Sequence, residues 1–469
     1  AMLDCKESVK KLAKVGYRRP RVTRQRLSTS VQKSRNVCRK ERTVIKIQER
    51  KNSNNHFHDG LCLMEAKGMD RKMKLYEEAL QMQDEIVALR RKIHRHPEIG
   101  RKEFRTSKLI REKLAEFGVD EIQSPVPTAV IGLIHGGKGA GRCVALRADI
   151  DALPVTEETG LPYSSEEAGM MHACGHDMHV AMLLGTAKLL CAHKNEFAGT
   201  VKLIFQHSED TLPGGARELV EVGALQNPHV DAIFGMHVFP DEEVGKIGFH
   251  AGPLTTSVDL YDVTVKGKGG HGSTPHLTKD PVLAACQAVV LLQQSPARYV
   301  DPLETVIFPV CSIHSGDAPN VIPNEAKFSG IARSYLDTIR EDVTKQVFDI
   351  AAGLEKISGC EFDINHYEGY PACYNDEALT ALAEDAVREA LGEERILQLE
   401  KPLSFSEDFS YYTKMTDTPG CYMMLHAGHE GPLVALHNPK CAVREEAMPY
   451  GMIAMTAAAL KYLGSADAQ

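Results

Sequence analysis

Apolar and polar positions along most of this chain follow two different periods. Some windows repeat apolar residues every three or four positions, which is typical of a helix with one buried face. Others are short apolar runs bounded by glycines, which predict buried strands. From about Leu75 the expected order is helix 86–93, helix 109–117, strand 129–134, strand 143–146, helix 180–190, strand 201–205, helix 215–222 and strand 232–237. Strands that alternate with helices predict a parallel or mixed sheet covered on both faces.

The pattern changes between residues 257 and 368. The expected order there is strand 260–265, helix 281–292, strand 305–313, strand 327–333, helix 336–357 and strand 361–367. This β-α-β-β-α-β order is that of a ferredoxin-like unit, which we expect to be inserted into the first domain. Helix 377–391, a strand near 421–425 and an Ala-rich helix over 445–463 then continue the first pattern.

These changes predict an α/β fold with two domains. Residues 71–256 and 370–469 would form the two parts of one domain, in which helices flank a mixed, mainly parallel sheet. Residues 257–369 would form the inserted α+β domain. A chain of 469 residues is long enough for two or more hydrophobic cores.

Residues 1–70 show no sustained apolar periodicity and are basic. Residues 1–74 carry 21 Lys and Arg against 7 Asp and Glu, although the net charge of the whole chain is −8. They could form a disordered tail that touches nucleic acid or an anionic membrane, or an Arg/Ser-rich transit segment. We favour a third interpretation, in which they lie upstream of a natural start at Met69 or Met73, because an alanine precedes Met2. We therefore base no function on them and do not expect nucleic acid as a partner.

The composition favours a globular protein of the cytoplasm. Its 12 cysteines have no repeating spacing, which argues against a disulfide framework and for a reducing compartment. The longest apolar run, residues 282–292, contains Gln287 and is too short to span a membrane. No segment near the N-terminus has the pattern of a signal peptide, so we expect no membrane partner.

The stretch Gly169–His179 holds the densest group of potential metal ligands. It reads G-M-M-H-A-C-G-H-D-M-H, and Cys174 and His176 lie two residues apart where an apolar helix is expected to begin. A thiolate and an imidazole held this closely are natural ligands for zinc or a similar metal. The alternative is a buried cysteine beside packed or solvated histidines.

Three of the expected strands end in groups that can bind metal or transfer protons. One leads into Arg147–Asp151, the next into Gln206–Asp210, and the third ends at His237. Ligands bind beyond the carboxyl ends of the strands in sheets of this kind. Because three strands end in such groups, a single shared site is a better explanation than three separate solvated loops.

Six motifs stand in the order of one metallohydrolase family. They are His172-Ala173-Cys174-Gly175-His176-Asp177, Glu209-Asp210, Gly235-Met236-His237, Gly269-Gly270-His271-Gly272, Asn320-Val321-Ile322-Pro323 and Leu436-His437-Asn438-Pro439-Lys440. Over roughly residues 75–463 the chain resembles the aminoacylase/carboxypeptidase family. Within it, the chain is similar to the branch of bacterial N-acyl-amino-acid amidohydrolases, hippurate hydrolases and plant auxin-conjugate hydrolases.

The resemblance implies a site with two divalent metal ions per subunit, for which Zn, Mn, Co and Ni are candidates. The implied ligands are Cys174, His176, Asp210, His237 and His437. Glu209 would be the general base and acid, since a carboxylate beside a metal-activated water can take its proton and pass it to the leaving amine. The alternative for Glu209 and Asp210 is a solvent-facing acidic turn.

One implied ligand departs from the family's pattern. The family usually has Glu-Glu where this chain has Glu209-Asp210, so the metal would lie closer to the backbone, bind more weakly or be a different ion. Asp149 and Asp151 stand where other branches carry a metal-binding His and an orienting Asp. We expect Asp151 to support a metal ligand, with a structural capping role as the alternative.

The region from residue 257 to 369 resembles the family's lid, which also forms the dimer contact. The resemblance therefore implies a homodimer or higher homo-oligomer, in which His271 stabilises the oxyanion in the partner's active site. Asn320 and Arg333 would hold the substrate's carbonyl and free carboxylate. The alternatives are a tight strand-to-helix connection around His271 and a solvated arginine at position 333.

The activity that the resemblance implies is metal-dependent amide hydrolysis. The substrate would be a small N-acyl-amino acid, with an acetyl, benzoyl or similar group, and the products a carboxylic acid and a free amino acid. One alternative is a dipeptidase or carboxypeptidase of the same family. The other is a catalytically silent relative that binds metal or peptides.

Overall fold

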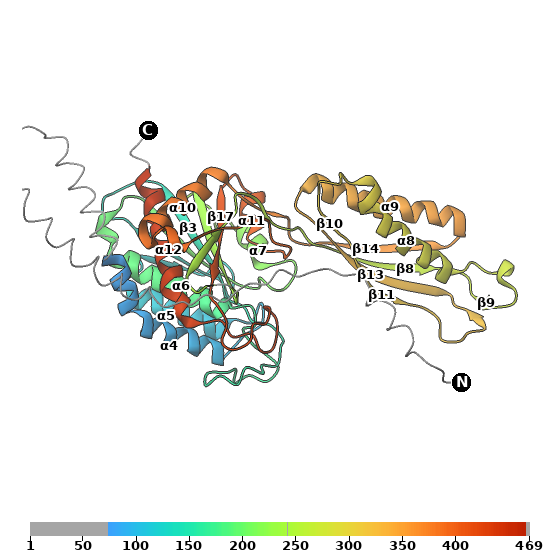
Figure 1. Ribbon diagram of the computed structural model, residues 1–469, viewed down its shortest axis with the longest axis horizontal. Coiled ribbons are helices and arrows are strands. Elements are labelled where there is room, and N and C mark those ends of the chain that lie inside the picture. The colour runs from blue at the N-terminus through green and yellow to red at the C-terminus, as the bar shows by residue number, and fades with distance from the viewer. Residues whose placement is uncertain (1–73, 242, 466–469) are drawn as a thin grey trace, which may run out of the picture. The chain divides into compact units, whose positions relative to one another are not determined.

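The computed structural model describes residues 74–241 and 243–465 and contains two large β-sheets. Each sheet has its own helices and its own hydrophobic core (Figure 1). The predicted tail, residues 1–70, lies outside the described residues. No helix in the described part of the chain has both the length and the apolar character that crossing a membrane requires.

The larger sheet has eight strands in the order β1-β2-β4-β3-β5-β17-β6-β16. Strands β4, β3, β5 and β17 run parallel to one another, whereas β2 and β6 are antiparallel to their inner neighbours. The bounds are β1 Glu121–Gln123, β2 Val130–His135, β3 Cys143–Asp149, β4 Thr200–Gln206, β5 Ala232–Phe239, β6 Lys246–Phe249, β16 Ile396–Gln398 and β17 Gly420–His426. This is the mixed, mainly parallel sheet that the sequence predicts.

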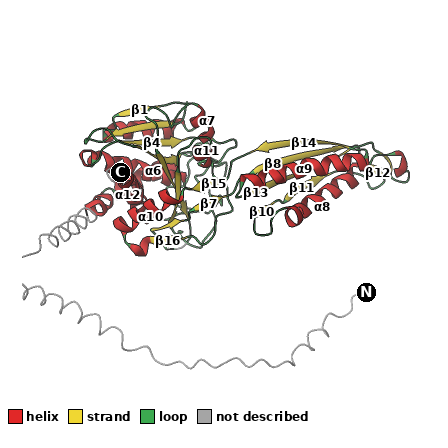
Figure 2. Ribbon diagram, turned by 90° about the horizontal axis from the view of Figure 1, so that it is seen from above, coloured by secondary structure: helices red, strands yellow, loops and turns green. Residues whose placement is uncertain are grey.

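Helices cover both faces of the larger sheet. On one face lie α4 (Gln83–Arg95), α5 (Phe104–Phe117), α6 (His176–Ala192), α10 (Glu377–Leu391) and α12 (Met448–Gly464), whose apolar side chains share one core. The short helices α7 (Gly215–Glu221) and α11 (Ser410–Lys414) contribute to a second core on the other face (Figure 2). Strand side chains alternate between the two cores, as expected for a sheet buried on both sides.

Helix α6 is buried on nearly all sides, and most of its residues are apolar. Of its 17 residues 14 are buried, because it packs against α4, α5, α12 and the central strand β3. A helix that is hydrophobic all round belongs in the interior. Its N-terminus, where His176 lies, is thereby fixed relative to the sheet.

The smaller sheet has the order β10-β13-β8-β14, with β11 also paired to β13. Its strands are β8 Asp259–Lys266, β10 Val306–Ile307, β11 Val310–His314, β13 Glu325–Ser334 and β14 Glu361–Glu368. Helices α8 (Pro281–Tyr299) and α9 (Asp337–Ser358) pack on one face of it. The element order is the predicted ferredoxin-like one, and the α/β fold class is confirmed. The domain limits at residues 257 and 369 stay predictions.

The single strand predicted over residues 305–313 is wrong. The chain forms two short strands there, β10 and β11, which pair with different parts of β13. Pro309 lies between them, and a proline has no backbone N–H to donate to the ladder. Its carbonyl still accepts a hydrogen bond from the Ile331 N–H at 3.2 Å, so the segment stays beside β13.

Several short elements were not predicted from the sequence. Strands β7 (Gly252–Thr255) and β15 (Cys373–Asn375) form one pair, and β9 (Gly270–His271) and β12 (Val321–Ile322) another. The 3-10 helices are η1 Lys194–Glu196, η2 Pro275–Leu277, η3 Glu393–Arg395 and η4 Glu445–Ala447. Runs of two to four residues are too short to show a period.

Candidate metal centre and pocket

A tight turn before α6 places Cys174 and His176 side by side. Between them Gly175 has φ +92°, in the left-handed region that glycine adopts without strain. A Cβ atom on Gly175 would lie 2.5 Å from Cγ2 of Val238, so no larger residue fits. Both flanking side chains are buried. The motif's central glycine is therefore required by both backbone angle and space.

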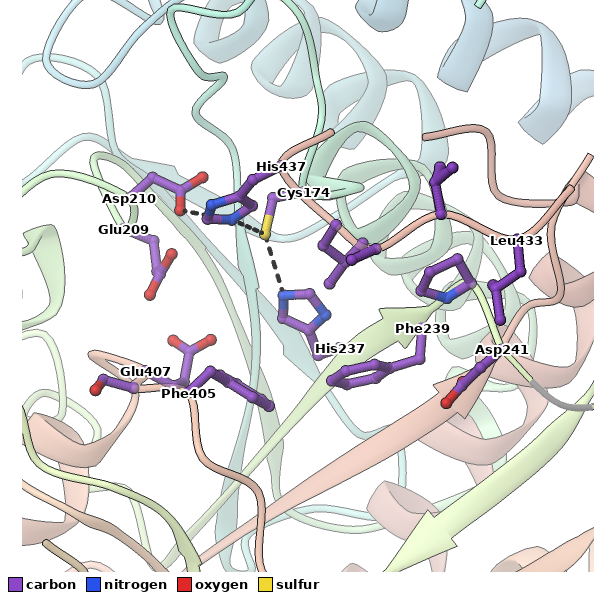
Figure 3. A pocket seen from close by; sticks show the side chains of 15 residues that line it. Cys174, Glu209, Asp210, His237, Phe239, Asp241, Phe405, Glu407, Leu433 and His437 are labelled. Atoms are coloured by element: carbon purple, nitrogen blue, oxygen red, sulfur yellow. Dashed lines mark hydrogen bonds and ion pairs between the residues drawn. The ribbon is translucent and has the colours of Figure 1, made fainter. Parts of the chain in front are cut away.

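The five side chains implied as ligands lie together around the sulfur of Cys174. Figure 3 shows Cys174, Asp210, His237 and His437. Its Sγ atom is 3.5 Å from Nε2 of His237 and 3.2 Å from Nε2 of His437. The same nitrogen of His437 is 3.4 Å from Oδ1 of Asp210. Among the described residues, two groups of donor atoms that lie within 4.8 Å of one another contain Cys174, namely Cys174–His176–His237 and Cys174–Asp210–His437. Cys174 belongs to both groups.

The imidazole rings are held so that one nitrogen stays free. Nδ1 of His176 hydrogen-bonds the Asp151 carbonyl oxygen at 3.0 Å and its Oδ1 at 3.2 Å. Nδ1 of His237 donates to the Val238 carbonyl at 2.8 Å. A neutral imidazole with a proton fixed on Nδ1 presents the lone pair of Nε2 to a metal. The two rings thus turn their remaining nitrogens toward the Cys174 sulfur.

Two buried polar atoms in this group have no hydrogen-bond partner among the described residues. They are Nε2 of His176 and Oδ2 of Asp210. Leaving a buried polar atom unsatisfied costs about 1–3 kcal/mol, and a bound cation would satisfy both. Ligand atoms around a tetrahedral zinc ion lie about 3.3–3.6 Å apart, given the usual bond lengths. The spacings around Cys174 are of this size, so the residues present fit divalent metal ions.

Asp151 and Asp149 both lie next to the implied ligands, but they form hydrogen bonds with different partners. Asp151 bonds His176 and, through Oδ2, accepts the backbone N–H of Asp210 at 3.0 Å, so it contacts two implied ligands. Asp149 accepts from Nδ1 of His179 at 2.6 Å and from Nη1 of Arg147 at 2.7 Å. Both oxygens of Asp149 are therefore engaged by protein groups.

Glu209 lies beside Asp210 on the loop that follows β4. Ser208, just before it, has φ +53°, and its N–H donates to Oε1 of the buried Glu103 at 2.8 Å. The hydroxyl of Tyr370 donates to the backbone carbonyl of Glu209. These bonds fix the loop, so the Glu209 carboxyl is held at the edge of the pocket.

Burial sets the protonation of this loop and of the thiol. It raises the pKa of Glu209 well above its ordinary value, and the carboxylates of Glu407 and Asp210 add to the effect. Burial also raises the pKa of Asp210 to about 7, although His176 opposes the shift. The pKa of the Cys174 thiol is raised by burial and by Asp210. Without a cation these groups hold protons, and a bound cation would displace them.

The histidines respond to different neighbours. Burial and the nearby His179 hold the pKa of His237 well below its ordinary value, so its ring is neutral. Burial also disfavours a charged His176, but Asp149 and Cys174 outweigh it and raise the pKa of His176. The proton on His176 is one that a metal ion would have to replace.

A buried arginine beneath the site was not singled out by the sequence reasoning. Arg147, fully buried, contacts Oδ2 of Asp149 at 2.7 Å, Oδ1 of Asp408 at 2.8 Å and Oε1 of Glu407 at 3.0 Å. One buried cation thus faces three carboxylates, and removing it would leave them uncompensated. Its only sequence signal is its place at the end of a strand.

Four of the five implied ligands, Cys174, Asp210, His237 and His437, line a pocket of about 680 Å³. The other lining residues are Glu209, Phe239, Pro240, Asp241, Phe405, Ser406, Glu407, Leu433, Val434, Ala435 and Leu436. Figure 3 shows Glu209 and Asp210 toward one end and Leu433 and Asp241 toward the other. Apart from Leu436, the apolar lining residues belong to no motif, so the sequence reasoning missed them.

The three residues expected to act from the inserted region do not line this pocket. His271 lies in the exposed β9–β12 ladder and Asn320 directly before β12, where its carbonyl accepts the N–H of Gly272 at 2.8 Å. Arg333 is half-buried and donates to Oγ of Ser406, a lining residue. Within the described part of the chain, Arg333 makes no ion pair with a carboxylate.

Comparisons with known proteins agree on one family. Residues 145–461 match peptidase family M20/M25/M40. The chain is 38% identical over 400 residues to thermostable carboxypeptidase 1 of Saccharolobus solfataricus, covering 84% of this chain and 99% of the relative. It is 35% identical over 369 residues to the N-acetyl-L-cysteine deacetylase of Bacillus subtilis, covering 78% and 85%.

A solved structure extends the likeness to the backbone. The YXEP protein of Bacillus subtilis, described as a dinuclear metal binding peptidase from the M20 family, superimposes with a TM-score of 0.70. It is 32% identical in sequence, and the match covers 82% of this chain and 99% of that one.

Proposed function

This chain belongs to peptidase family M20/M25/M40 and is a metal-dependent hydrolase of amides, and we propose a specific substrate class for it. The proposed substrates are N-acyl-amino acids. The products would be a carboxylic acid and a free amino acid. The observation that carries the proposal is the convergence of two donor groups on the Cys174 sulfur, with the Glu209 carboxyl in the same pocket.

The donor set suits two divalent ions that share one sulfur. Cys174, His176 and His237 would hold one ion, and Cys174, Asp210 and His437 the other. Thiolate and imidazole donors favour Zn, Co or Ni, and the carboxylate also admits Mn. Bound ions of this kind polarise an amide carbonyl and lower the pKa of a water molecule. Asp210, although one methylene shorter than Glu, reaches the other donors, which speaks for a competent site.

Glu209 is the group that would move the proton. Its carboxylate takes a proton from the attacking water and delivers it to the amide nitrogen, while the bond between carbonyl carbon and nitrogen breaks. A carboxyl whose pKa is raised by burial holds a proton more readily than an exposed one. Asp151 would act by holding both His176 and the backbone of Asp210.

Further roles are proposed for the inserted region. Arg333 would bind the carboxylate of the substrate, because it is a half-buried cation whose described neighbours offer it only hydroxyls. His271 and Asn320 would serve the site of a second subunit. Exposed apolar side chains on α8, Leu283 at 59% and Val290 at 57%, support a homodimer formed through this region. The nine cysteines of the described residues are unpaired, which supports a cytoplasmic location.

A second candidate activity is the removal of C-terminal residues from short peptides. The similarity to a thermostable carboxypeptidase favours it. The same metal group, general base and carboxylate-binding arginine would serve both reactions. The two reactions differ in the group on the acyl side of the scissile bond, which is a simple acyl group in one and an amino acid or peptide in the other. A panel with both kinds of substrate therefore separates the two activities.

The test is release of free amine from N-acetyl-, N-benzoyl- and dipeptide substrates with added Mn²⁺ or Zn²⁺. We expect release to stop on chelation and to fall about 10²–10⁴-fold in Glu209→Gln, because the proton carrier is lost. Glu116→Gln, an exposed glutamate on α5, is the matched control and should keep full activity. Metal analysis should find two ions per subunit in all three proteins. A protein with two ions and no activity on any substrate would refute the proposal.

A further inference from the structure

We propose that the apolar end of the pocket binds the acyl group of the substrate, and that it selects neutral, apolar acyl groups against those ending in a carboxylate. This inference rests on the proposed amide hydrolysis and specifies its substrate class. It assigns a role to Phe239, Phe405, Leu433 and Asp241, which no motif singles out.

The two ends of the pocket differ in chemistry. Phe239 lies toward the end that holds Leu433 and Asp241, and its ring centroid is 5.4 Å from that of His237 (Figure 3). The ring of Phe405, 5.6 Å from that of Phe239 and 5.9 Å from that of His237, continues the apolar surface toward Glu407. The loop that carries Leu433 closes the same end and adds further apolar side chains. The other end holds Glu209 and Glu407 (Figure 3). A substrate therefore meets carboxyl groups on one side of the metal ligands and an apolar wall on the other.

The direction of the substrate follows from the position of the base. Glu209 has to reach the leaving nitrogen, so the amino-acid part of the substrate lies on the Glu209 side. The scissile carbonyl lies beside the metal ligands, which occupy the middle of the pocket. The acyl substituent then points away from Glu209, toward Phe239 and Leu433.

Asp241 gives the apolar end its charge preference. Its half-buried carboxylate hydrogen-bonds Nδ1 of His426 at 3.1 Å, and this bond lowers the pKa of Asp241, so it is ionised at neutral pH. No lysine or arginine is among the described lining residues of the pocket. An acyl chain that ends in a carboxylate would place a second anion beside Asp241, with no lysine or arginine among the described lining residues to offset it. A methyl or phenyl end would instead contact Phe239 and Leu433.

The test uses one amino acid, alanine, with acyl groups of increasing size: acetyl, butanoyl, hexanoyl and phenylacetyl. We expect kcat/KM to rise about threefold per methylene until the apolar end is filled. N-adipoyl-alanine replaces the terminal methyl of N-hexanoyl-alanine by a carboxylate and should be hydrolysed at least about tenfold less efficiently. A flat series, or equal rates for hexanoyl and adipoyl, would overturn the inference.

Variants locate the effect in the pocket. Phe405→Ala should flatten the dependence on acyl length, and Leu433→Asp should do the same from an exposed position where folding is not at stake. Asp241→Asn should reduce the ratio of kcat/KM for N-hexanoyl-alanine to kcat/KM for N-adipoyl-alanine. Asp417→Asn, at an exposed site outside the pocket, is its matched control and should keep the native ratio. A ratio that Asp241→Asn leaves unchanged would contradict the role of Asp241.

A binding measurement separates this inference from the proposed function. Calorimetry on metal-loaded Glu209→Gln should show N-hexanoyl-alanine binding about tenfold more tightly than N-adipoyl-alanine. If the native enzyme hydrolyses none of these amides, the proposed function fails, and the calorimetry still reports on the pocket. If hydrolysis is efficient and the two ligands bind equally, the proposed function stands and the acyl selection fails.

Discussion

His179, the third histidine of the Cys/His motif, is engaged by the protein on both ring nitrogens. Its Nδ1 donates to Asp149, and its Nε2 accepts the N–H of Val238 at 2.9 Å. The carbonyl of the same Val238 accepts from Nδ1 of His237. His179 therefore holds Val238, the residue whose carbonyl orients His237, and its ring lies 4.7 Å from the His237 ring.

Two substitutions of His179 should differ in their effect on metal binding. In His179→Gln the side-chain oxygen can still accept the Val238 N–H, whereas the shorter chain of His179→Asn cannot reach it. We expect His179→Asn to weaken metal affinity about 10–100-fold and His179→Gln to retain most of it. Competition with a chromogenic chelator measures both constants. Equal affinities in the two variants would show that the Val238 contact does not orient His237.

Helices α4 and α6 are joined by a buried ion group at the N-terminus of α6. Asp177, in the first turn of α6, accepts from Nε of Arg90 at 2.9 Å and from Nδ1 of His94 at 2.8 Å. The second ring nitrogen of His94 lies 3.3 Å from Oε1 of Glu157. An acidic residue in the first turn also complements the helix dipole. The group fixes the end of α6 that carries His176.

This group predicts a dependence of stability on alkaline pH. Burial alone would lower the pKa of His94, but Asp177 and Glu157 raise it to about 9. A raised folded-state pKa stabilises the protein fully below the ordinary value near 6.5, and the contribution is lost as pH rises through 9. Native protein should therefore lose up to about 3 kcal/mol more unfolding free energy between pH 6.5 and 9.5 than His94→Gln does. Urea denaturation across this range measures the difference.

The exposed His135, paired with Glu121, provides the control for that experiment. His135→Gln should follow the native pH profile, because an exposed pair contributes little. Parallel profiles for native protein and His94→Gln would mean that the His94–Asp177 contact does not stabilise the charged ring.

Elements with long apolar patterns were predictable from the sequence, and short ones were not. Helix α6 and strands β3, β4 and β5 each bury a continuous run of residues, which leaves a readable signal. Strands β6 and β16 have four and three residues and leave none. The break between β10 and β11 follows from Pro309 alone. Whether a proline interrupts a strand depends on whether its missing N–H faces a neighbouring strand, and the sequence does not show this.

The candidate site was predictable in its residue types but not in its connections. Motifs identify Cys174 and His437 as candidates, yet only the fold shows that they share one contact across 263 positions of sequence. The pairing of Arg147 with Asp408 spans 261 positions. Such contacts depend on how the strands order themselves in the sheet, and that order is not a local property of the chain.

For the molecule as a whole, the candidate metal group links stability to pH and, through the proposed cations, to metal content. The pKa of Asp210, raised to about 7, means that the folded metal-free protein holds a proton that the unfolded chain releases near pH 4. Folding of the metal-free protein is therefore disfavoured increasingly as pH rises from about 4 to 7. A cation that replaces this proton removes the penalty.

Removal of metal should accordingly cost more stability at higher pH. We expect the gap in Tm between metal-loaded and chelated protein to widen from pH 5.5 to pH 8, and metal binding to release protons. Differential scanning calorimetry gives the gap, and titration calorimetry in two buffers of different ionisation enthalpy counts the protons. In Asp210→Asn the Tm gap should increase less between pH 5.5 and pH 8 than in the native protein. A gap of constant size at all pH values would contradict the linkage.

The spacing of the donor group along the chain also bears on how the protein is made. Cys174 and His437 are 263 positions apart, and the whole smaller sheet is encoded between them. Ribosomes add about 5–20 residues per second, so roughly 13 to 50 seconds separate the synthesis of these two residues. Throughout that interval the nascent chain carries the Cys174 thiol without its last partner. The donor group can therefore be completed only late in synthesis, after the ribosome has added His437.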